Sequence, residues 1–327
     1  MRENYDEIKK KFTTFMCAWS DPENTDLSQI ITDDILCNLS VVKAYSDGAQ
    51  HSRFGVDSFL KHFPQKEFLY WRICNFVCRT SEDQAQQSAV VPCRALQIKQ
   101  DGEVKFCEFT VLFANHWQKR SGSWWLQELR MDVVKHSGDL ETIEEEWFFE
   151  EGKPGYRQGI HLPCIVGELD SPWARIKFSD TVLTEEEQIQ EVVAKHNFGL
   201  DHLIFDYTAD TLHEDFHTMN SNFGGMDKRF CINVEKYHRQ SNRHWVHPYL
   251  LSNIEIRGDD ATLDFYRMAG HSQRKQPYIF TLDNMHMEYA CAKGSFRMIK
   301  QLGEWQIISM NYYLGIYELG EYELKLK

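Results

Sequence analysis

Hydrophobic spacing along the chain passes from a helical to a strand-like period, and it does so twice. Between Asn4 and Trp19 apolar residues recur every three or four positions, with lysines on the opposite side, which predicts an amphipathic helix. An aromatic and β-branched pattern follows, with strands predicted at 68–79, 89–99, 104–118 and 124–134. Because only short polar breaks separate these strands, they should form an antiparallel meander.

Two shorter helices are expected between the first helix and this meander. Asp26 precedes the apolar residues Ile30 and Ile31 and is a suitable N-cap for a short helix. Residues 35–42 are then expected to be extended, and a Gly-Val-Asp sequence is expected to open a further helix over 55–63. The first half therefore reads as three helices followed by four strands.

The same order returns in the second half. Thr184 and Glu187 form a capping-box pattern ahead of a long helix, and a second helix is expected after Asp210. The sequence Gly-Met-Asp at 225–227 repeats the Gly-x-Asp pattern of 55–57. Strands are predicted at 245–257, 261–268, 285–300 and 305–317.

Short motifs at predicted hairpin turns support an internal duplication. The pattern Lys-x-x-Gly-x-Trp occurs at 119–124 and again at 300–305, and the turn at 82–85 aligns with the turn at 258–261. Turn residues recur for local reasons, so each match alone is weak. Their common order across both halves favours a tandem repeat of one domain.

The chain should divide into three parts. Residues 1–135 form one domain, residues 184–327 form a second, and residues 136–183 connect them with an acidic run followed by glycines and prolines. Trp173 and Ile176 make this connection too apolar for a free tether, so part of it should pack on a domain as a strap.

Composition narrows the classes of function. The 327 residues carry 36 basic and 49 acidic side chains, a net charge of −13, which disfavours nucleic acid and anionic membranes as partners. No secretion signal and no apolar run of about 18 residues occurs, so we expect a cytoplasmic protein. Its nine cysteines have irregular spacing and should be reduced thiols; Cys74 and Cys78 should share one strand face. No nucleotide-binding or serine-hydrolase motif is present, so no cofactor is expected.

Two segments of the second half resemble a known superfamily. The strand, charged turn and Trp-x-Ile of 294–307, together with the stretch 253–261, resemble SnoaL-like members of the nuclear-transport-factor-2-like (NTF2-like) superfamily. The resemblance covers residues 184–318 more fully than residues 4–134. It implies an α+β fold of two cone domains, each with three N-terminal helices packed in a curved antiparallel sheet of four to six strands. A pocket inside each cone is implied as well.

The resemblance also bears on assembly. Such cones commonly pair through their outer sheet faces, so the two domains are expected to form an intramolecular pseudo-dimer, with a homodimer of whole chains as a further option.

Candidate chemistry concentrates in the second half, which holds most of the 14 histidines. His247, Tyr249 and Asn253 share one face of a predicted strand. In dehydratase-like relatives a histidine on this strand works with an aspartate near the end of the first helix, which points to Asp206 as the partner of His247. This chain departs from the pattern of those relatives in two ways. Asp201 stands where the pattern has a tyrosine, and the histidine position could fall on Tyr249.

Further binding residues complete the prediction. Tyr207 and Trp245 are candidates in the second half, and Trp71 and Asn75 lie on the corresponding strand of the first, which is expected to be noncatalytic. Elsewhere, His213 and His217 are spaced by four on an expected helix, but two ligands do not make a metal site, and none is expected.

Two functions remain open from the sequence. The first is a small-molecule-binding protein for an apolar, ring-containing ligand, which could act as a cofactor-free dehydratase, isomerase or cyclase through an Asp–His pair. The alternative is a noncatalytic protein that uses its sheet faces for interaction or assembly. The first requires an enclosed polar site, whereas the second requires a filled interior and an exposed apolar sheet face.

Overall fold

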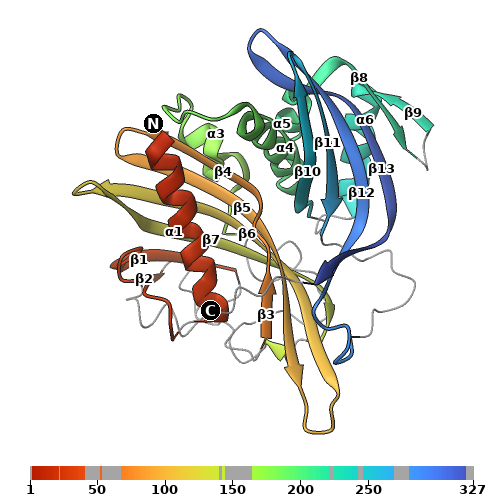
Figure 1. Cartoon of the computed structure of the whole chain (residues 1–327). Coiled ribbons are helices and arrows are strands. Elements are labelled where there is room, and N and C mark those ends of the chain that lie inside the picture. Colours follow the sequence, from red (N-terminus) through yellow and green to blue (C-terminus); the bar gives the residue numbers. More distant parts are fainter. Residues whose placement is uncertain are drawn as a thin grey trace.

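The computed structural model describes residues 2–21, 23–40, 52–53, 68–139, 142–143, 164–220, 224–241, 246–268 and 280–321. The fold is α+β and contains two separate mixed sheets, one in each half of the chain (Figure 1). None of the helices in these ranges is long and apolar enough to cross a membrane.

In the described residues of the first half, one long helix lies on a seven-stranded sheet. Its elements are α1 (Arg2–Ser20), β1 (Ile31–Leu39), β2 (Ser52–Arg53), β3 (Phe68–Trp71), β4 (Cys74–Ser81), β5 (Gln84–Ile98), β6 (Val104–Arg120) and β7 (Ser123–Gly138). The strand order is β2-β1-β7-β6-β5-β3, with β4 also paired to β5. Helix α1 lies across one face of this curved sheet (Figure 1).

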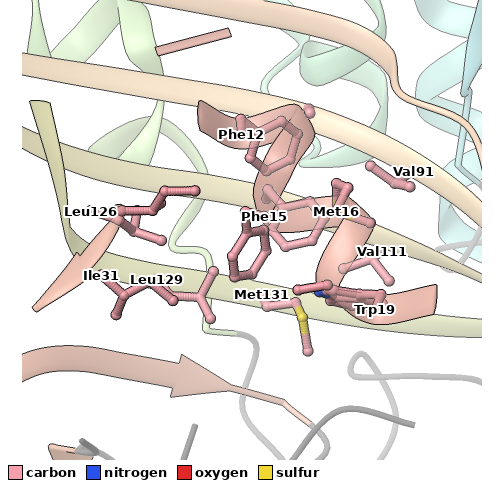
Figure 2. Close-up of a cluster of buried hydrophobic side chains, with 14 of the residues drawn as sticks. Phe12, Phe15, Met16, Trp19, Ile31, Val91, Val111, Leu126, Leu129 and Met131 are labelled. Atoms are coloured by element: carbon pink, nitrogen blue, oxygen red, sulfur yellow. The ribbon is translucent and has the colours of Figure 1, made fainter. Parts of the chain in front are cut away.

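Aromatic side chains fill the space between α1 and the sheet. Phe12, Phe15 and Trp19 are buried and point toward the strands (Figure 2). Phe12 and Trp19 both contact Phe113 of β6 edge-on, with ring centroids 5.2 and 6.0 Å apart. The helical period of the sequence therefore buries its apolar face as predicted, and the described interior of the first sheet is packed with side chains.

Two predictions for the first half are wrong. No helix follows Asp26: its carboxylate accepts a hydrogen bond from Ser28 N (2.8 Å) in a turn, and β1 begins at Ile31. The sheet is also not purely antiparallel, because β1 pairs parallel with β7. A strand that precedes the meander is joined to it by no hairpin, so no turn fixes its direction. The helix predicted at 55–63 lies outside the described residues.

The second half contains a six-stranded sheet with helices on one side. Its elements are α4 (Glu185–Asp201), α5 (Phe205–Asp210), β8 (Leu212–Asn220), β9 (Gly224–Asp227), α6 (Lys228–Ser241), β10 (Tyr249–Arg257), β11 (Asp260–Arg267), β12 (Met287–Gln301) and β13 (Glu304–Glu321). The strand order is β10-β11-β12-β13-β8-β9, and β8 pairs parallel with β13.

Of three helix predictions for the second half, two are confirmed and one is wrong. The capping box of Thr184 and Glu187 is present at the start of α4. Asp227 accepts a hydrogen bond from Phe230 N (2.7 Å) and opens α6 as predicted. The helix expected after Asp210 is wrong, since α5 ends at that residue and strand β8 follows it.

The face of the first sheet that points away from α1 packs against the second half, where α4 and β10 contact β4. On β6, Val111 and Phe113 face α1, whereas the alternate residues Leu112 and Ala114 cluster with Val246 of the second half. Two more mixed clusters extend this contact: Tyr70 and Leu96 with Phe280, Met285 and Tyr289, and Cys74 with Met268 and Ala290.

A register shift in β4 contributes to this interface. Cys78 belongs to the core beneath α1, whereas Cys74 faces the second half, so the prediction that both share one face is wrong. The pairing of β4 with β5 shifts between Cys74 and Val77, and Asn75 between them has a left-handed backbone with φ of 50°. A bulge of this kind reverses the alternation of side chains.

Ion pairs and the strap add polar contacts between the halves. Arg72 forms a bidentate pair with Glu288, with nitrogen–oxygen distances of 2.5 and 2.6 Å. Residues 164–183 of the strap contain the short helices η4 (Gly167–Asp170) and α3 (Pro172–Arg175). Asp132 of β7 accepts hydrogen bonds from Cys164 N (2.7 Å) and Ile165 N (3.2 Å). Residues 164–180 therefore pack on the first half, with Ile176 buried.

Three hydrogen bonds recur in both halves at equivalent positions. The first half has bonds from Lys119 N to Asp83 O (2.7 Å), Trp124 Nε1 to Asn4 Oδ1 (3.2 Å) and Leu126 N to Ile30 O (2.8 Å). The second half has bonds from Lys300 N to Asp259 O (2.7 Å), Trp305 Nε1 to Glu185 Oε2 (2.8 Å) and Ile307 N to Thr211 O (2.8 Å). The donors in each pair are 181 residues apart (300 − 119 = 181).

Candidate functional site

A buried charged cluster forms where α4 ends, α6 ends and the chain enters β10. His247 Nδ1 lies 2.6 Å from Asp201 Oδ1, and Arg239 Nη2 lies 3.0 Å from His247 Nδ1 and 3.7 Å from Asp201 Oδ1. The side chains of Asp201 and Arg239 are 1% and 2% exposed, and that of His247 is 8% exposed. His247 is thus the member of the cluster nearest to solvent.

Helix periodicity explains how α4 and α6 supply this cluster. Ile189, Val193, Asn197 and Asp201 follow one another at intervals of four, so one face of α4 carries apolar residues first and polar residues at its end. Arg239 lies in the last turn of α6, where a cation interacts favourably with the helix dipole. The Asp201 carboxylate offsets the cost of burying this guanidinium.

The tautomer of His247 follows from its contact with Asp201. The carboxylate accepts from His247 N through Oδ2 (3.0 Å), and the short Nδ1–Oδ1 distance fits Nδ1–H as the second donor. Nε2 then keeps its lone pair and lies 3.5 Å from Arg239 Nη2. An aspartate that fixes a histidine in this way orients the ring for proton transfer at Nε2.

Asn197 adds a buried amide one helical turn before Asp201. Its side chain is fully buried, and neither its Nδ2 nor its Oδ1 has a hydrogen-bond partner in the described part of the chain. A buried amide of this kind costs about 1–3 kcal/mol per unsatisfied group, so a water or a ligand ordinarily satisfies it. This side chain marks a position where a donor and an acceptor are both available.

Aromatic and basic side chains of the sheet lie beyond the cluster. Tyr249 stacks on Phe265 with ring centroids 4.4 Å apart, and burial raises the pKa of the Tyr249 hydroxyl well above its usual value. Arg267 donates to Tyr312 Oη (3.1 Å) and to the carbonyl of Val246 (2.8 and 3.0 Å). Burial also raises the pKa of Tyr312, so both tyrosines are neutral donors near neutral pH.

The two residues predicted as a catalytic pair have different environments. His247 is buried as expected, but Asp206 is exposed on α5, and the carboxylate that contacts His247 is Asp201. Helix α4 ends at Asp201, and Leu203 with φ of 63° turns the chain before α5 begins. The turn places Asp206 on a separate helix with its side chain toward solvent.

The predicted binding residues of the second half are likewise dispersed. Tyr249 belongs to the buried core, while Asn253 is exposed and donates to Asp264 Oδ2 (2.8 Å). Tyr207 faces the strap, where its hydroxyl lies 2.9 Å from Ser171 Oγ and its ring contacts Trp173. Trp245 lies outside the described residues.

In the first half the two predicted binding residues serve different contacts. Trp71 donates from Nε1 to Ser20 Oγ (3.2 Å) at the end of α1. Asn75 reaches the second half, where its Nδ2 donates to the His247 carbonyl (2.7 Å) and its Oδ1 accepts from Tyr249 N (3.2 Å).

Sequence reasoning missed Asp201, Arg239 and Asn197 as members of the site. A signal for the two α4 residues was present, since both continue the four-residue spacing of Ile189 and Val193. Arg239 had no such signal, because its burial depends on how α6 packs against Asp201.

Other histidines of the second half have different roles. His196 is fully buried against Thr211 Oγ1 (2.9 Å), and burial lowers its pKa to about 4. His213 and His217 lie on β8 rather than on the expected helix, and His217 is exposed. Over the described ranges, no group of three histidine, cysteine, aspartate or glutamate side chains is placed to hold a metal ion.

A small cavity lies beside this cluster, between α4 and the first sheet. It is lined by Asn75 and Ser88 on one side and by Ala194, Phe198 and Asp201 on the other, among other residues, and its volume is about 10 Å³. That volume accommodates one water molecule at most. A larger groove of about 460 Å³ is open to solvent between residues 81–84 and residues 174–178.

Comparison with known proteins identifies similar solved structures only. No protein-family model matches the chain, and no curated protein matches it. The Kfla4162 protein from Kribbella flavida shares 14% identity over 42% of this chain and 93% of its own, with a TM-score of 0.34.

Two further structures of similar extent bear fold descriptions. A cystatin-like-fold protein of unknown function from Nostoc punctiforme shares 17% identity over 41% of this chain and 94% of its own, with a TM-score of 0.30. An NTF2-like protein with a cystatin-like fold from Novosphingobium aromaticivorans shares 14% identity over 40% of this chain and 81% of its own, with a TM-score of 0.30.

Proposed function

We propose that the second domain binds a small organic molecule that carries a carbonyl or hydroxyl group and an apolar ring. The observation that supports this most is the Asn197 amide, buried with both polar atoms unpartnered among the described residues and placed one turn from Asp201. Its NH₂ group would donate to a ligand oxygen and its carbonyl would accept from a hydroxyl. The rings of Tyr249, Phe265 and Tyr312 pack against one another on the sheet side.

The Asp201–His247 pair supports a proton transfer without a cofactor. His247 Nε2 would take a proton from a carbon next to the ligand carbonyl, and the electron pair of that bond would move to the carbonyl oxygen as an enolate. Asp201 would stabilise the resulting imidazolium, and the Arg239 cation would favour the charge on the enolate oxygen. Returning the proton to another carbon gives isomerisation, and delivering it to a departing hydroxyl gives dehydration.

The first domain is proposed to be a noncatalytic partner of the second. We infer a tandem duplication with domains 1–135 and 184–327 joined by the strap 136–183, supported by the recurring hydrogen bonds at a separation of 181 residues. Packing of the outer face of the first sheet against the second half, α4 included, supports an intramolecular pseudo-dimer. Aromatic filling beneath α1 supports a structural role for the first domain.

A ligand screen on paired variants tests the proposed site. Wild-type protein would be screened by thermal shift against steroids, aromatic polyketides and aromatic acids, and each hit would be confirmed by calorimetry. A ligand at 100 times its Kd should stabilise the folded state by about 2.7 kcal/mol. Asn197→Leu and His247→Gln should abolish the shift, whereas the exposed His217→Gln should retain it.

Two results would contradict the proposal. One is a hit that binds Asn197→Leu and the wild type equally, because the ligand would then occupy another site. The other is a complete absence of hits combined with a higher melting temperature for Asn197→Leu, which would show that the amide is only an unfavourable core residue.

A further inference from the structure

The segment that carries His247 is held by side chains from both domains. From the carbonyl of Val246 to the amide of Tyr249, each backbone polar group is hydrogen-bonded. Arg267 donates to the Val246 carbonyl (2.8 and 3.0 Å), His247 N donates to Asp201 (3.0 Å), and the Pro248 carbonyl accepts from Met268 N (3.0 Å). The two groups that remain, the His247 carbonyl and Tyr249 N, bind Asn75 of the first domain (2.7 and 3.2 Å).

We propose that Asn75 is a positioning residue through which the first domain fixes the orientation of His247 in the second. Asn75 contacts the backbone on both sides of Pro248, so it sets the direction in which the chain enters β10. The His247 side chain leaves that same backbone and meets Asp201 at 2.6 Å. This inference extends the proposed function: the site of the second domain is complete only when the first domain is docked.

The left-handed backbone at position 75 does not by itself explain the contacts that the Asn75 side chain makes. Its φ of 50° falls in the left-handed region, which asparagine tolerates better than most residues. Asn253 on β10 has the same φ of 50°, but its side chain is exposed and bonds only locally, to Asp264 of the neighbouring strand (2.8 Å). Two asparagines with the same φ thus differ in their partners, because only the Asn75 side chain bonds to the backbone of the other half.

Surrounding contacts make the docked position of Asn75 rigid. The Arg72–Glu288 ion pair lies three residues before it, and Glu288 is 4% exposed. Cys74 packs with Met268, the residue whose amide holds the Pro248 carbonyl. Movement of the first domain would therefore be transmitted to the His247 segment through β4.

The matched variants Asn75→Gly and Asn253→Gly test this inference in the full-length chain. Glycine keeps the left-handed backbone at low cost and removes only the side chain. Histidine ring signals would be recorded by NMR on selectively labelled protein, with His247 assigned from its loss in His247→Gln. We expect Asn75→Gly to shift the His247 ring signals and to weaken binding of any ligand found by about tenfold, from the loss of two hydrogen bonds. Asn253→Gly should change neither.

The outcomes separate this inference from the proposed function. If no ligand binds the wild type but Asn75→Gly still shifts His247, the positioning role stands and the ligand proposal fails. An unchanged His247 spectrum in Asn75→Gly would overturn the positioning role, whatever the ligand result. Circular dichroism and a thermal melt confirm that the variant is folded; if it is not, Asn75→Asp, which keeps the size and removes the NH₂ donor, must shift the same signals.

Discussion

Removal of the Asp201 carboxylate is the perturbation for which the structure gives the largest expected effect. In Asp201→Ala the guanidinium of Arg239, 2% exposed and 3.7 Å from the lost oxygen, would remain buried without its carboxylate. His247 N and Nδ1 would each lose an acceptor. Breaking one partner of a buried ion pair costs about 3–5 kcal/mol, because the other charge stays desolvated. Replacement of the exposed Asp206 by alanine should change stability by no more than about 0.5 kcal/mol.

Urea denaturation followed by tryptophan fluorescence and circular dichroism would measure both variants. Because the chain contains two packed sheets, the unfolding curve should be fitted for more than one transition, and the unfolding free energy of the transition that reports on the second half should be compared. With a slope of about 2 kcal/mol per molar urea, a loss of 3–5 kcal/mol lowers the midpoint by roughly 1.5–2.5 M. Equal midpoints for Asp201→Ala and Asp206→Ala would refute the assignment of Asp201 as the buried partner of Arg239 and His247.

Two more predictions concern the interface and pH. Arg72→Ala should leave the Glu288 carboxylate, 4% exposed, without its bidentate partner and lower stability by about 2–4 kcal/mol, whereas Arg257→Ala, at an 83% exposed arginine, should be neutral in the same denaturation assay. His196 has a folded-state pKa of about 4, below the unfolded value of about 6.5, so its contribution is present above pH 6.5 and is lost as the pH falls toward 4. Stability measured across this window should fall by about 3 kcal/mol more in the wild type than in His196→Gln, and parallel curves would contradict the assignment.

Local patterns predicted much of the architecture. The spacing of three and four residues between Phe12, Phe15 and Trp19 specifies which face of α1 is buried, and the capping box at Thr184 specifies where α4 begins. Hairpin turns around Gly122 and Gly303, both with left-handed φ, fix the last two strands of each sheet. These features depend on residues within one or two turns of each other, so the sequence shows them directly.

The candidate site was only partly predictable. His247 was identified from its strand face and the family resemblance, but its partner was not, because the end of α4 at Asp201 and the turn at Leu203 determine which aspartate points inward. The predicted partner, Asp206, lies five residues beyond the end of α4 and is exposed, whereas Asp201 at the helix end is buried. The exact residue at which a helix ends is difficult to predict from helix propensities.

Contacts between residues far apart in the sequence set the remaining features of the fold and the site. Residue patterns along the chain determined the order of the long strands and the apolar faces of the long helices. The parallel pairing of β1 with β7, the convergence of Asp201, Arg239 and His247, and the reach of Asn75 into the other domain each join residues more than 30 positions apart or on different elements. Such contacts depend on the packing of whole sheets, which no short window of sequence encodes.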